Sequence, residues 1–493
     1  MKKLLKILLL FTILLALLLS ASLFFLFSDK GNKFLKPYIQ AEIEKKIKLP
    51  VDVSFFKLRF DNTEIKLTIN SALNIEAKSD FSVFTQKFNG NYQILANNFL
   101  YKKIELIQAN IHGIFRGTPD DIEINGKGTS FNAPLDYIIN VVEGEVKGLT
   151  ATLNGMDISK VLTLMAKPKF LQGKIEGMIK INDINTLNGE FSLRGKDLIS
   201  EPIAMKKLIG KSVSMNMDVM IKGDINNANA SILALLKSSF GELTLNKMLL
   251  DIKKKHFDTD YSLDILDLEK LQTLTQKKLY GKLLLEGNLS KRKSLKIIGK
   301  TTSLGGEIEY KFLSDIFNAN MHDVRVINML KILGYPQVIN GKVSGKITHN
   351  IKEKRGTVAF KIKEFQLFPN KMTKMLAYII QKDPTHIMFD ETSLNATIKG
   401  DDIRYTLVAK GNGAGITIEN GYINPLADKH RATIKFMYHS YAIAITLSGS
   451  VSNPKITLDT EGLISTQMTK EVQNKVKKEV EGKVKRFFKK LGF

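Results

Sequence analysis

The sequence has no cysteine and no tryptophan, and only 11 of its 493 residues are proline. Without cysteine, disulfide bridges, thiolate metal ligands and cysteine nucleophiles are excluded. This absence does not locate the protein, because cysteine-free chains are compatible with oxidising and reducing compartments alike. Proline- and serine-rich linkers are also lacking, so the composition favours one continuous body over domains joined by flexible tethers.

Motifs for catalysis and metal binding are missing as well. The seven histidines include no pair at the spacing of a helical metal site, and no Gly-x-Ser-x-Gly elbow occurs. The glycine-rich segment Gly411–Gly415 lacks the lysine of a phosphate loop, so it predicts a hairpin turn. The carboxylate pairs Asp120–Asp121 and Asp401–Asp402 predict solvated turns. We therefore expect that the protein has no enzymatic activity, no cofactor and no metal site. A hydrolase of the cell envelope is the least favoured hypothesis.

Acidic residues are too few to balance the basic ones. The chain has 73 Lys and Arg against 49 Asp and Glu, a formal net charge of +24. Such an excess attracts anionic partners, of which nucleic acid and acidic lipid are the common classes. The charge is spread along the chain without a basic motif rich in aromatic residues, which favours a membrane-proximal role and no nucleic-acid partner.

Only one hydrophobic run is long enough to cross a bilayer. Residues 7–27 carry no charge and would form a helix of about 31 Å, close to the hydrocarbon thickness. Lys2, Lys3 and Lys6 precede this run, which places the N-terminus in the cytoplasm. Residues 1–28 are therefore predicted to be a cytoplasmic stub and a single-pass anchor. A cleaved signal peptide is the alternative, but the apolar run continues past the small residues at 20–22.

Residues 464–493 are predicted to form a basic amphipathic helix, because apolar side chains recur there at helical spacing with lysines between them. This helix packs on the last strands or lies on an anionic membrane surface. The membrane-surface candidates are Lys475, Lys477, Lys478, Lys485, Arg486, Phe487 and Phe488.

The body, residues 29–463, begins with a helix predicted at 34–47 and continues mainly as β-strands. Alternating apolar positions indicate strands with one buried face, separated by turns such as Asn125–Gly126, Gly305–Gly306 and Asn420–Gly421. The candidates for the apolar lining of this face are Ile65, Leu67, Ile69, Ile122, Ile124, Ile179, Ile181, Ile416, Ile418, Ile456 and Leu458. Alternation by itself leaves a sandwich, a barrel and an open trough as alternatives.

A repeated unit also indicates an array of strands. An aspartate, a short amphipathic helix and a Gly-Lys-apolar strand start occur in this order after Asp157, Asp267 and Asp323. Apolar stripes predict short helices at 158–165, 326–333 and 372–379. The first two copies are about twice as far apart as the last two, which leaves room for another copy between them.

The order of segments resembles the AsmA-like family. The segment after the anchor, Leu35–Ile39 followed by Val51–Val53, is similar to the start of those proteins. The C-terminal segments Phe389–Thr392 and Leu447–Asp459, followed by a lysine-rich tail, are similar to their C-terminal region. Leu49–Pro50 departs from the glycine turn common in the family, and the middle of the chain matches only through its Gly-Lys strand starts.

This resemblance implies an elongated, twisted antiparallel sheet rolled into an open, taco-like groove, related to bridge-like lipid transfer proteins. It implies attachment to the bacterial inner membrane, a periplasmic body, and acyl lipid such as phospholipid as the partner, with a role in outer-membrane lipid homeostasis. A non-enzymatic scaffold that assists outer-membrane or other envelope proteins is the alternative hypothesis.

Overall fold

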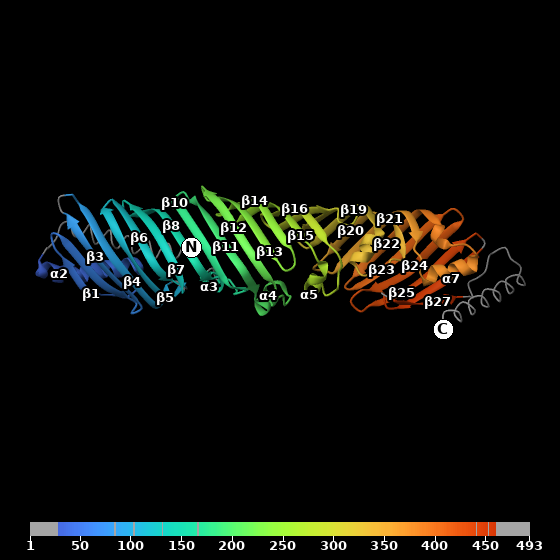
Figure 1. Cartoon of the computed structure of the whole chain (residues 1–493), viewed down its shortest axis with the longest axis horizontal. Helices are drawn as coiled ribbons and strands as arrows, with labels where there is room; N and C mark the ends of the chain where they lie inside the picture. The colour runs from blue at the N-terminus through green and yellow to red at the C-terminus, as the bar shows by residue number, and fades with distance from the viewer. Residues whose placement is uncertain are drawn as a thin grey trace, which may run out of the picture. The chain divides into compact units, whose positions relative to one another are not determined.

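The computed structural model describes residues 28–82, 85–101, 104–130, 132–164, 167–439, 441–451 and 453–459. This part of the chain is mainly β, as the sequence predicts, with 27 strands and a few short helices. It divides into two compact units: unit 1 is Met1–Ser239 and Thr244–His256, and unit 2 is Phe240–Leu243 and Phe257–Phe493. Within each unit, strands that follow one another in the chain lie side by side (Figure 1).

Unit 1 is an antiparallel meander in which each strand pairs with the next, except that β8 pairs with β10 and the short β9 pairs with β11. Its strands are β1 Val51–Leu58, β2 Asn62–Ile69, β3 Leu73–Ser82, β4 Lys87–Tyr101, β5 Ile104–Thr118, β6 Asp121–Ser130, β7 Ala133–Val142, β8 Glu145–Asp157, β9 Leu171–Gln172, β10 Lys174–Asp183, β11 Asn188–Ser200, β12 Asn216–Asn226 and β13 Asn229–Ser238. Strand β14, Glu242–Asp251, contains residues of both units.

Unit 2 is also an antiparallel meander, in which every strand from β15 to β27 pairs with the next. Its strands are β15 His256–Ile265, β16 Leu283–Lys291, β17 Leu295–Thr301, β18 Glu307–Leu313, β19 Ile316–Arg325, β20 Ile339–Asn350, β21 Arg355–Leu367, β22 Met388–Lys399, β23 Asp402–Gly411, β24 Ala414–Asn424, β25 Lys429–Tyr438, β26 Tyr441–Gly449 and β27 Pro454–Asp459. The described strands of each unit form an open sheet rather than a sandwich or a closed barrel.

Apart from α2, which has 19 residues and precedes β1, the helices are short and lie in the connections between strands. They are α2 Asp29–Ile47, α3 Ile158–Leu164, α4 Pro202–Ile209, α5 Gln272–Thr275, α6 Val326–Ile332 and α7 Lys371–Ile380, with 3-10 turns η1 Leu268–Leu271 and η2 Pro384–His386. The helices predicted at 34–47, 158–165, 326–333 and 372–379 are confirmed, within a residue at their ends except at the start of the first, and residue 165 lies outside the described residues. Helix α2 begins five residues before the predicted start, because Ser28 caps it by accepting a hydrogen bond from the Gly31 amide at 3.2 Å.

Two copies of the repeated unit share the same backbone hydrogen bond across the helix and loop. The backbone amide of Ile158 donates to the Gly173 carbonyl at 3.0 Å, and that of Leu268 donates to the Gly281 carbonyl at 2.9 Å. Each bond ties the residue after the aspartate to the glycine before the next strand. Helix α4, which the sequence analysis did not predict, occupies the interval between these two copies and is capped by Glu201 instead of aspartate.

Of the turns predicted at Asn125–Gly126, Gly305–Gly306 and Asn420–Gly421, two are wrong. Gly305–Gly306 lies in a turn as expected, but Asn125–Gly126 lies in the middle of β6 and Asn420–Gly421 lies inside β24, next to a β-bulge. Both glycines continue strand pairing, so their role there is not to reverse the chain. The side chains that lie over them explain the choice of residue and are described below.

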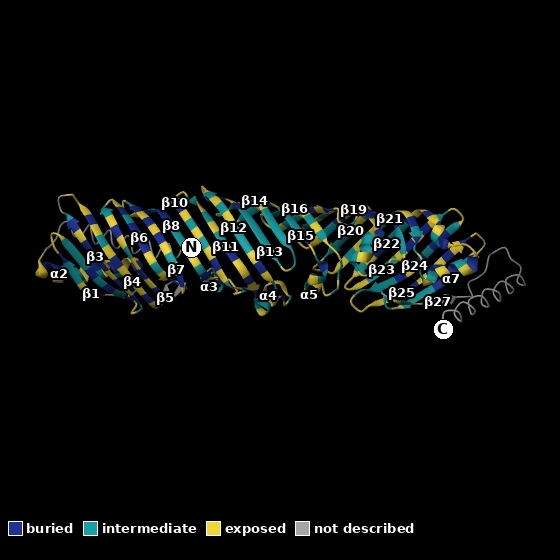
Figure 2. Cartoon of the chain, in the orientation of Figure 1, coloured by how far each residue is buried: buried dark blue, intermediate teal, exposed yellow. Residues whose placement is uncertain are grey.

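Buried side chains alternate with exposed ones along the strands (Figure 2). We call the face with the buried side chains the apolar face; it includes Leu67, Ile124 and Ile139 in unit 1 and Leu407 and Ile434 in unit 2. In unit 1 these residues form one cluster over β1–β8 and a smaller one around α3 and β11. In unit 2 they form one cluster over β18–β26 with α6 and α7.

Candidate functional site

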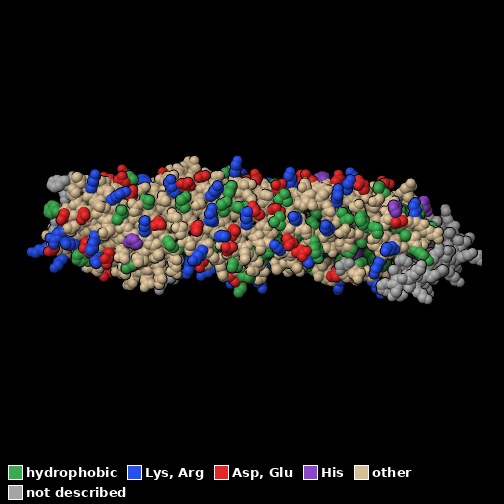
Figure 3. All heavy atoms as spheres, in the orientation of Figure 1, with side chains coloured by type: hydrophobic (Ala, Val, Ile, Leu, Met, Phe, Trp, Pro, Cys, Tyr) green, Lys and Arg blue, Asp and Glu red, His purple; other side chains and the backbone are tan. Residues whose placement is uncertain are grey.

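The solvent face of the strands is polar and carries both signs of charge. Figure 3 shows Lys, Arg, Asp and Glu side chains along the strands, with apolar side chains scattered among them. Cross-strand ion pairs on this face join Lys78 to Glu64 at 3.1 Å in unit 1 and Lys435 to Glu419 at 3.0 Å in unit 2. Such exposed pairs contribute little to stability.

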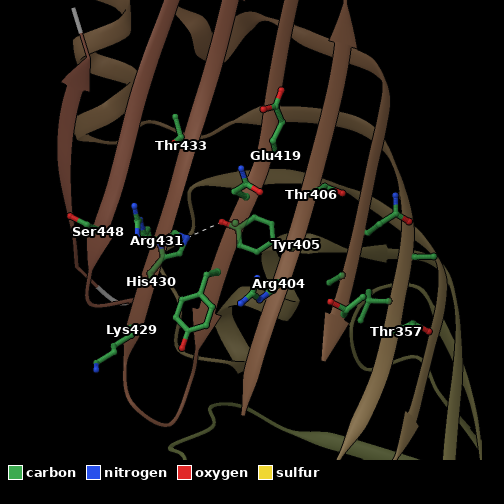
Figure 4. Close-up of a pocket in the computed structure, with 18 of the residues that line it drawn as sticks. Thr357, Arg404, Tyr405, Thr406, Glu419, Lys429, His430, Arg431, Thr433 and Ser448 are labelled. Atoms are coloured by element: carbon green, nitrogen blue, oxygen red, sulfur yellow. Dashed lines mark hydrogen bonds between the residues drawn. The ribbon is translucent and has the colours of Figure 1, made fainter. Parts of the chain in front are cut away.

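Two concave sites in the described part of the chain are lined mainly by residues of this polar face. One, of about 1180 Å³, lies over β21–β26 of unit 2 (Figure 4). Its exposed side chains include Arg404 and Arg431, which flank Tyr422 on neighbouring strands. Tyr422 donates a hydrogen bond to Asp402 at 2.7 Å, and this bond lowers the pKa of that carboxyl group. The site presents positive charge to solvent and adds to the basic character of the chain.

The second concave site, of about 1110 Å³, lies over β3–β7 of unit 1. Its solvent-facing side chains include Asp80, Asn89 and Ile114, and the ion pair of Arg116 with Glu123 at 2.7 Å. Both concave sites are open and combine polar with apolar surface, whereas pockets for small ligands are usually enclosed and largely apolar. The apolar face is therefore the stronger candidate for a ligand-binding surface.

The sequence-predicted lining residues lie on the apolar face wherever the structure describes their side chains, and most are fully packed. Ile65, Leu67, Ile69, Ile122, Ile124, Ile181, Ile416 and Ile418 are all buried, with exposed fractions between 0% and 8%. Only Ile179 and Ile456 are half-buried, and the side chain of Leu458 lies outside the described residues. Ile179 and Ile456 are therefore the candidates that retain surface for a ligand.

The apolar face of unit 1 changes along the sheet. Over β5–β7 the side chains of Phe115, Ile122 and Val141 are at most 1% exposed. Over β10–β13 the same face is only partly filled: Ile175, Ile181 and Ile232 are buried. Its half-buried residues are Ile179, Phe191, Leu193, Val219, Ile221 and Leu236. These residues are cross-strand neighbours, and no charged side chain interrupts their rows. We call these residues the half-buried apolar strip; most of them pack partly against the buried clusters, and all keep the rest of their surface exposed.

Unit 2 has a similar strip over β15–β20. Its half-buried apolar-face residues include Tyr261, Leu263, Leu285, Leu289, Ile297, Tyr310, Phe312, Phe317 and Ile347. Toward β22–β26 the same face is packed, with Phe389, Phe436 and Ile445 at most 1% exposed. Each unit therefore has a filled part and a half-buried part, and the half-buried parts are the last strands of unit 1 and the first strands of unit 2 along the chain.

Tyrosine pairs cross the apolar face of both units. In unit 1, Tyr92 on β4 faces Gly113 on β5, Gly113 faces Gly126 on β6, and Gly126 faces Tyr137 on β7. The two rings lie over the glycines, and their hydroxyl oxygens meet at 2.5 Å. A side chain on Gly126 would lie 2.2 Å from the Tyr137 ring, so only glycine allows this arrangement.

The same arrangement recurs in unit 2. Tyr261 on β15, Gly287 on β16, Gly299 on β17 and Tyr310 on β18 form one cross-strand row. The two tyrosines lie on strands that are separated by two others, yet their hydroxyl oxygens are 2.6 Å apart. Tyrosine–glycine–glycine–tyrosine bridges are therefore a shared structural device of the two units, which the sequence analysis missed because it depends on register.

A shorter bridge occurs further along unit 2. The Tyr405 ring lies over Gly421, and its hydroxyl bonds Nε2 of His430 at 2.8 Å (Figure 4). Burial raises the pKa of Tyr405 to about 12 and lowers the pKa of His430, so a neutral imidazole accepts this hydrogen bond. Gly126 and Gly421, the two glycines misassigned to turns, both lie under a tyrosine ring.

The remaining predictions concern chemistry and membranes. Among the described residues there is no group of His, Cys, Asp and Glu side chains that could hold a metal ion. The helices of the described chain include none long and apolar enough to span a bilayer. The predicted anchor at 7–27 and the membrane-surface candidates Lys475, Lys477, Lys478, Lys485, Arg486, Phe487 and Phe488 lie outside the described residues.

Comparison with known proteins adds no further assignment. Neither a protein-family model nor a curated protein matches this chain.

Proposed function

We propose that this protein binds acyl lipid on its apolar face and transfers it within the bacterial cell envelope, where it contributes to outer-membrane lipid homeostasis. The observation that carries the proposal is the half-buried apolar strip over β10–β13 and over β15–β20. Water in contact with such a strip is unfavourable, and each methylene group that an acyl chain buries there contributes about 0.8 kcal/mol. Lipid transfer of this kind needs no catalytic residue.

The burial pattern also supports a curled sheet. Phe115, Ile122 and Val141 are at most 1% exposed, yet α2 is the only described helix in their cluster. A flat sheet would leave these side chains open to water, so we infer that the strands curve and cover one another. Where the curl is looser, over β10–β13, the face would form the groove that the resemblance to AsmA-like proteins implies.

The location of the protein is part of the same proposal. An anchor at 7–27 would hold the body at the inner membrane, on the periplasmic side, and the net charge of +24 would favour anionic lipid head groups. The basic helix proposed at 464–493 would then touch a membrane surface. The alternative, a scaffold for outer-membrane proteins, requires no free apolar strip.

Native mass spectrometry of the gently purified full chain tests the proposal. Wild-type protein should carry phospholipid and take it up again from vesicles of phosphatidylethanolamine and phosphatidylglycerol after delipidation. In Ile179→Glu a charge enters the half-buried strip, where Ile179 faces Phe191 and Ala151 on the neighbouring strands, so uptake should fall.

The matched control is Met178→Glu. Met178 is the preceding residue on β10, points to the solvent face and is 37% exposed, so this variant should take up lipid like the wild type. Circular dichroism would verify that both variants fold. A wild-type protein that binds no phospholipid, or equal uptake by the two variants, would contradict the proposal and favour the scaffold.

A further inference from the structure

The tyrosine pairs of the two units differ in their hydrogen bonds. A tyrosine hydroxyl has one hydrogen to donate, so in a pair of hydroxyls one hydrogen is shared and the second needs another acceptor. In unit 1 that acceptor is the Asn125 carbonyl, which Tyr92 reaches at 3.4 Å while Tyr137 donates to Tyr92. Both rings are buried, with exposed fractions of 3% and 5%. This pair is closed to a ligand.

The pair in unit 2 has an uncommitted hydrogen. Tyr261 and Tyr310 bond each other at 2.6 Å, and in the described chain neither hydroxyl reaches a further acceptor. Both side chains are half-buried and belong to the strip over β15–β20. Burial and the bond to Tyr261 raise the pKa of Tyr310, so the hydroxyl stays protonated at neutral pH.

The surroundings of this pair make it a distinct polar point. The hydroxyl groups of Thr259 and Thr301, on the same face, already donate to the Asp260 carbonyl and to Ser303. Along the row, Tyr310 is followed by Ala319 and Ile347, which offer no polar group. A ligand that lies along this row therefore meets the hydroxyl pair among apolar side chains. On the neighbouring row of the same face, Phe317 pairs with His349, whose buried Nδ1 has no hydrogen-bond partner among the described residues.

We propose that the Tyr261–Tyr310 hydroxyl pair is a hydrogen-bonding site that binds an ester carbonyl oxygen of an acyl lipid. The inference rests on the proposed function, because it requires acyl chains on the strip. An ester carbonyl is an acceptor located where the head group meets the acyl chains, so binding it fixes the depth to which the chains enter. Ether lipids of the same length and head group lack this acceptor.

The test is competition between two lipids on the delipidated full chain, read by native mass spectrometry. Dipalmitoyl phosphatidylglycerol and its dihexadecyl ether analogue are offered in equal amounts. Wild-type protein should favour the ester lipid by about fivefold, the ratio that corresponds to a net hydrogen-bond contribution of about 1 kcal/mol. Because each tyrosine alone retains one hydroxyl hydrogen, Tyr261→Phe and Tyr310→Phe should both keep a preference.

The double variant Tyr261→Phe/Tyr310→Phe should bind both lipids in a ratio near one. Tyr405→Phe is the matched control, because its half-buried hydroxyl already bonds His430, and it should keep the wild-type ratio. Equal binding of both lipids by the wild type, or an unchanged ratio in the double variant, would overturn this inference and leave the proposed function standing. Failure of the wild type to bind either lipid would overturn the proposed function and the inference together.

Discussion

The tyrosine bridge in unit 1 predicts that adding one methyl group beneath it lowers the free energy of unfolding of this unit substantially. The change is Gly126→Ala on β6, which introduces a Cβ atom 2.2 Å from Cζ of Tyr137 and 2.4 Å from the Tyr92 hydroxyl oxygen. Real Cβ atoms do not approach neighbours so closely, so both rings must move. Neither ring moves easily, because both are buried in the main cluster of unit 1.

Two terms set the expected magnitude. Overpacking of a buried site costs about 1 to 3 kcal/mol. Separation of the two hydroxyls costs about 1 kcal/mol if water replaces the bond, and up to about 3 kcal/mol if the groups stay buried without a partner. The free energy of unfolding of unit 1 should therefore fall by about 2 to 6 kcal/mol.

Hydrogen–deuterium exchange with mass spectrometry measures this loss of stability separately for each unit, from the exchange rates of its peptides. A loss of 2 kcal/mol speeds exchange of the most protected amides of β4–β7 by about 30-fold. Peptides from unit 2 serve as an internal reference and should exchange at the wild-type rate.

Gly148→Ala on β8 is the matched control for this prediction. A Cβ atom there meets only ordinary contacts, the nearest at 3.4 Å, so this variant should be neutral or slightly more stable. Similar exchange in Gly126→Ala and Gly148→Ala would refute the argument that glycine is required beneath the tyrosine rings.

Two further predictions concern unit 2. Burial lowers the pKa of His430, so below about pH 6.5 the unfolded state binds a proton that the folded state resists. The free energy of unfolding should therefore fall as the pH drops from about 6.5 toward the folded-state pKa of His430. The urea midpoint of His430→Phe should lack this part of the pH dependence. Equal dependence of the urea midpoint on pH in the two proteins would contradict the prediction. Asn370 caps α7 by accepting hydrogen bonds from the amides of Met372 and Thr373 at 2.8 and 3.1 Å. Asn370→Ala should weaken the helix by about 1 kcal/mol, seen as about fivefold faster amide exchange in α7, and unchanged exchange would show that packing alone holds the helix.

Local patterns in the sequence were sufficient for several helices and for the buried side of the strands in which alternation was recognised. The alternation at Ile65, Leu67 and Ile69 placed all three on the apolar face, where they are buried. The helical stripe at 372–379 predicted α7, and the hairpin at Gly411–Gly415 joins β23 to β24 as expected. These features depend on side-chain period and turn chemistry, which neighbouring residues alone determine.

The same patterns misled where a residue's role depends on another strand. Asn125–Gly126 has the composition of a tight turn, and its neighbours in sequence give no contrary signal. Only the register, which aligns Tyr92, Gly113, Gly126 and Tyr137 in one row, shows that the glycine makes room for two rings. Register is a long-range property, because it depends on residues up to 45 positions apart in this row.

The sequence by itself therefore determined a mainly β chain with one apolar and one polar face, since these follow from local period and composition. Only the tertiary structure decided which part of the apolar face is filled and which is half-buried. Ile122 and Ile179 have the same alternating context, yet Ile122 is fully buried and Ile179 retains exposed surface. The physical reason is that the burial of a side chain depends on which side chains from other strands contact it, and no local sequence pattern encodes those contacts.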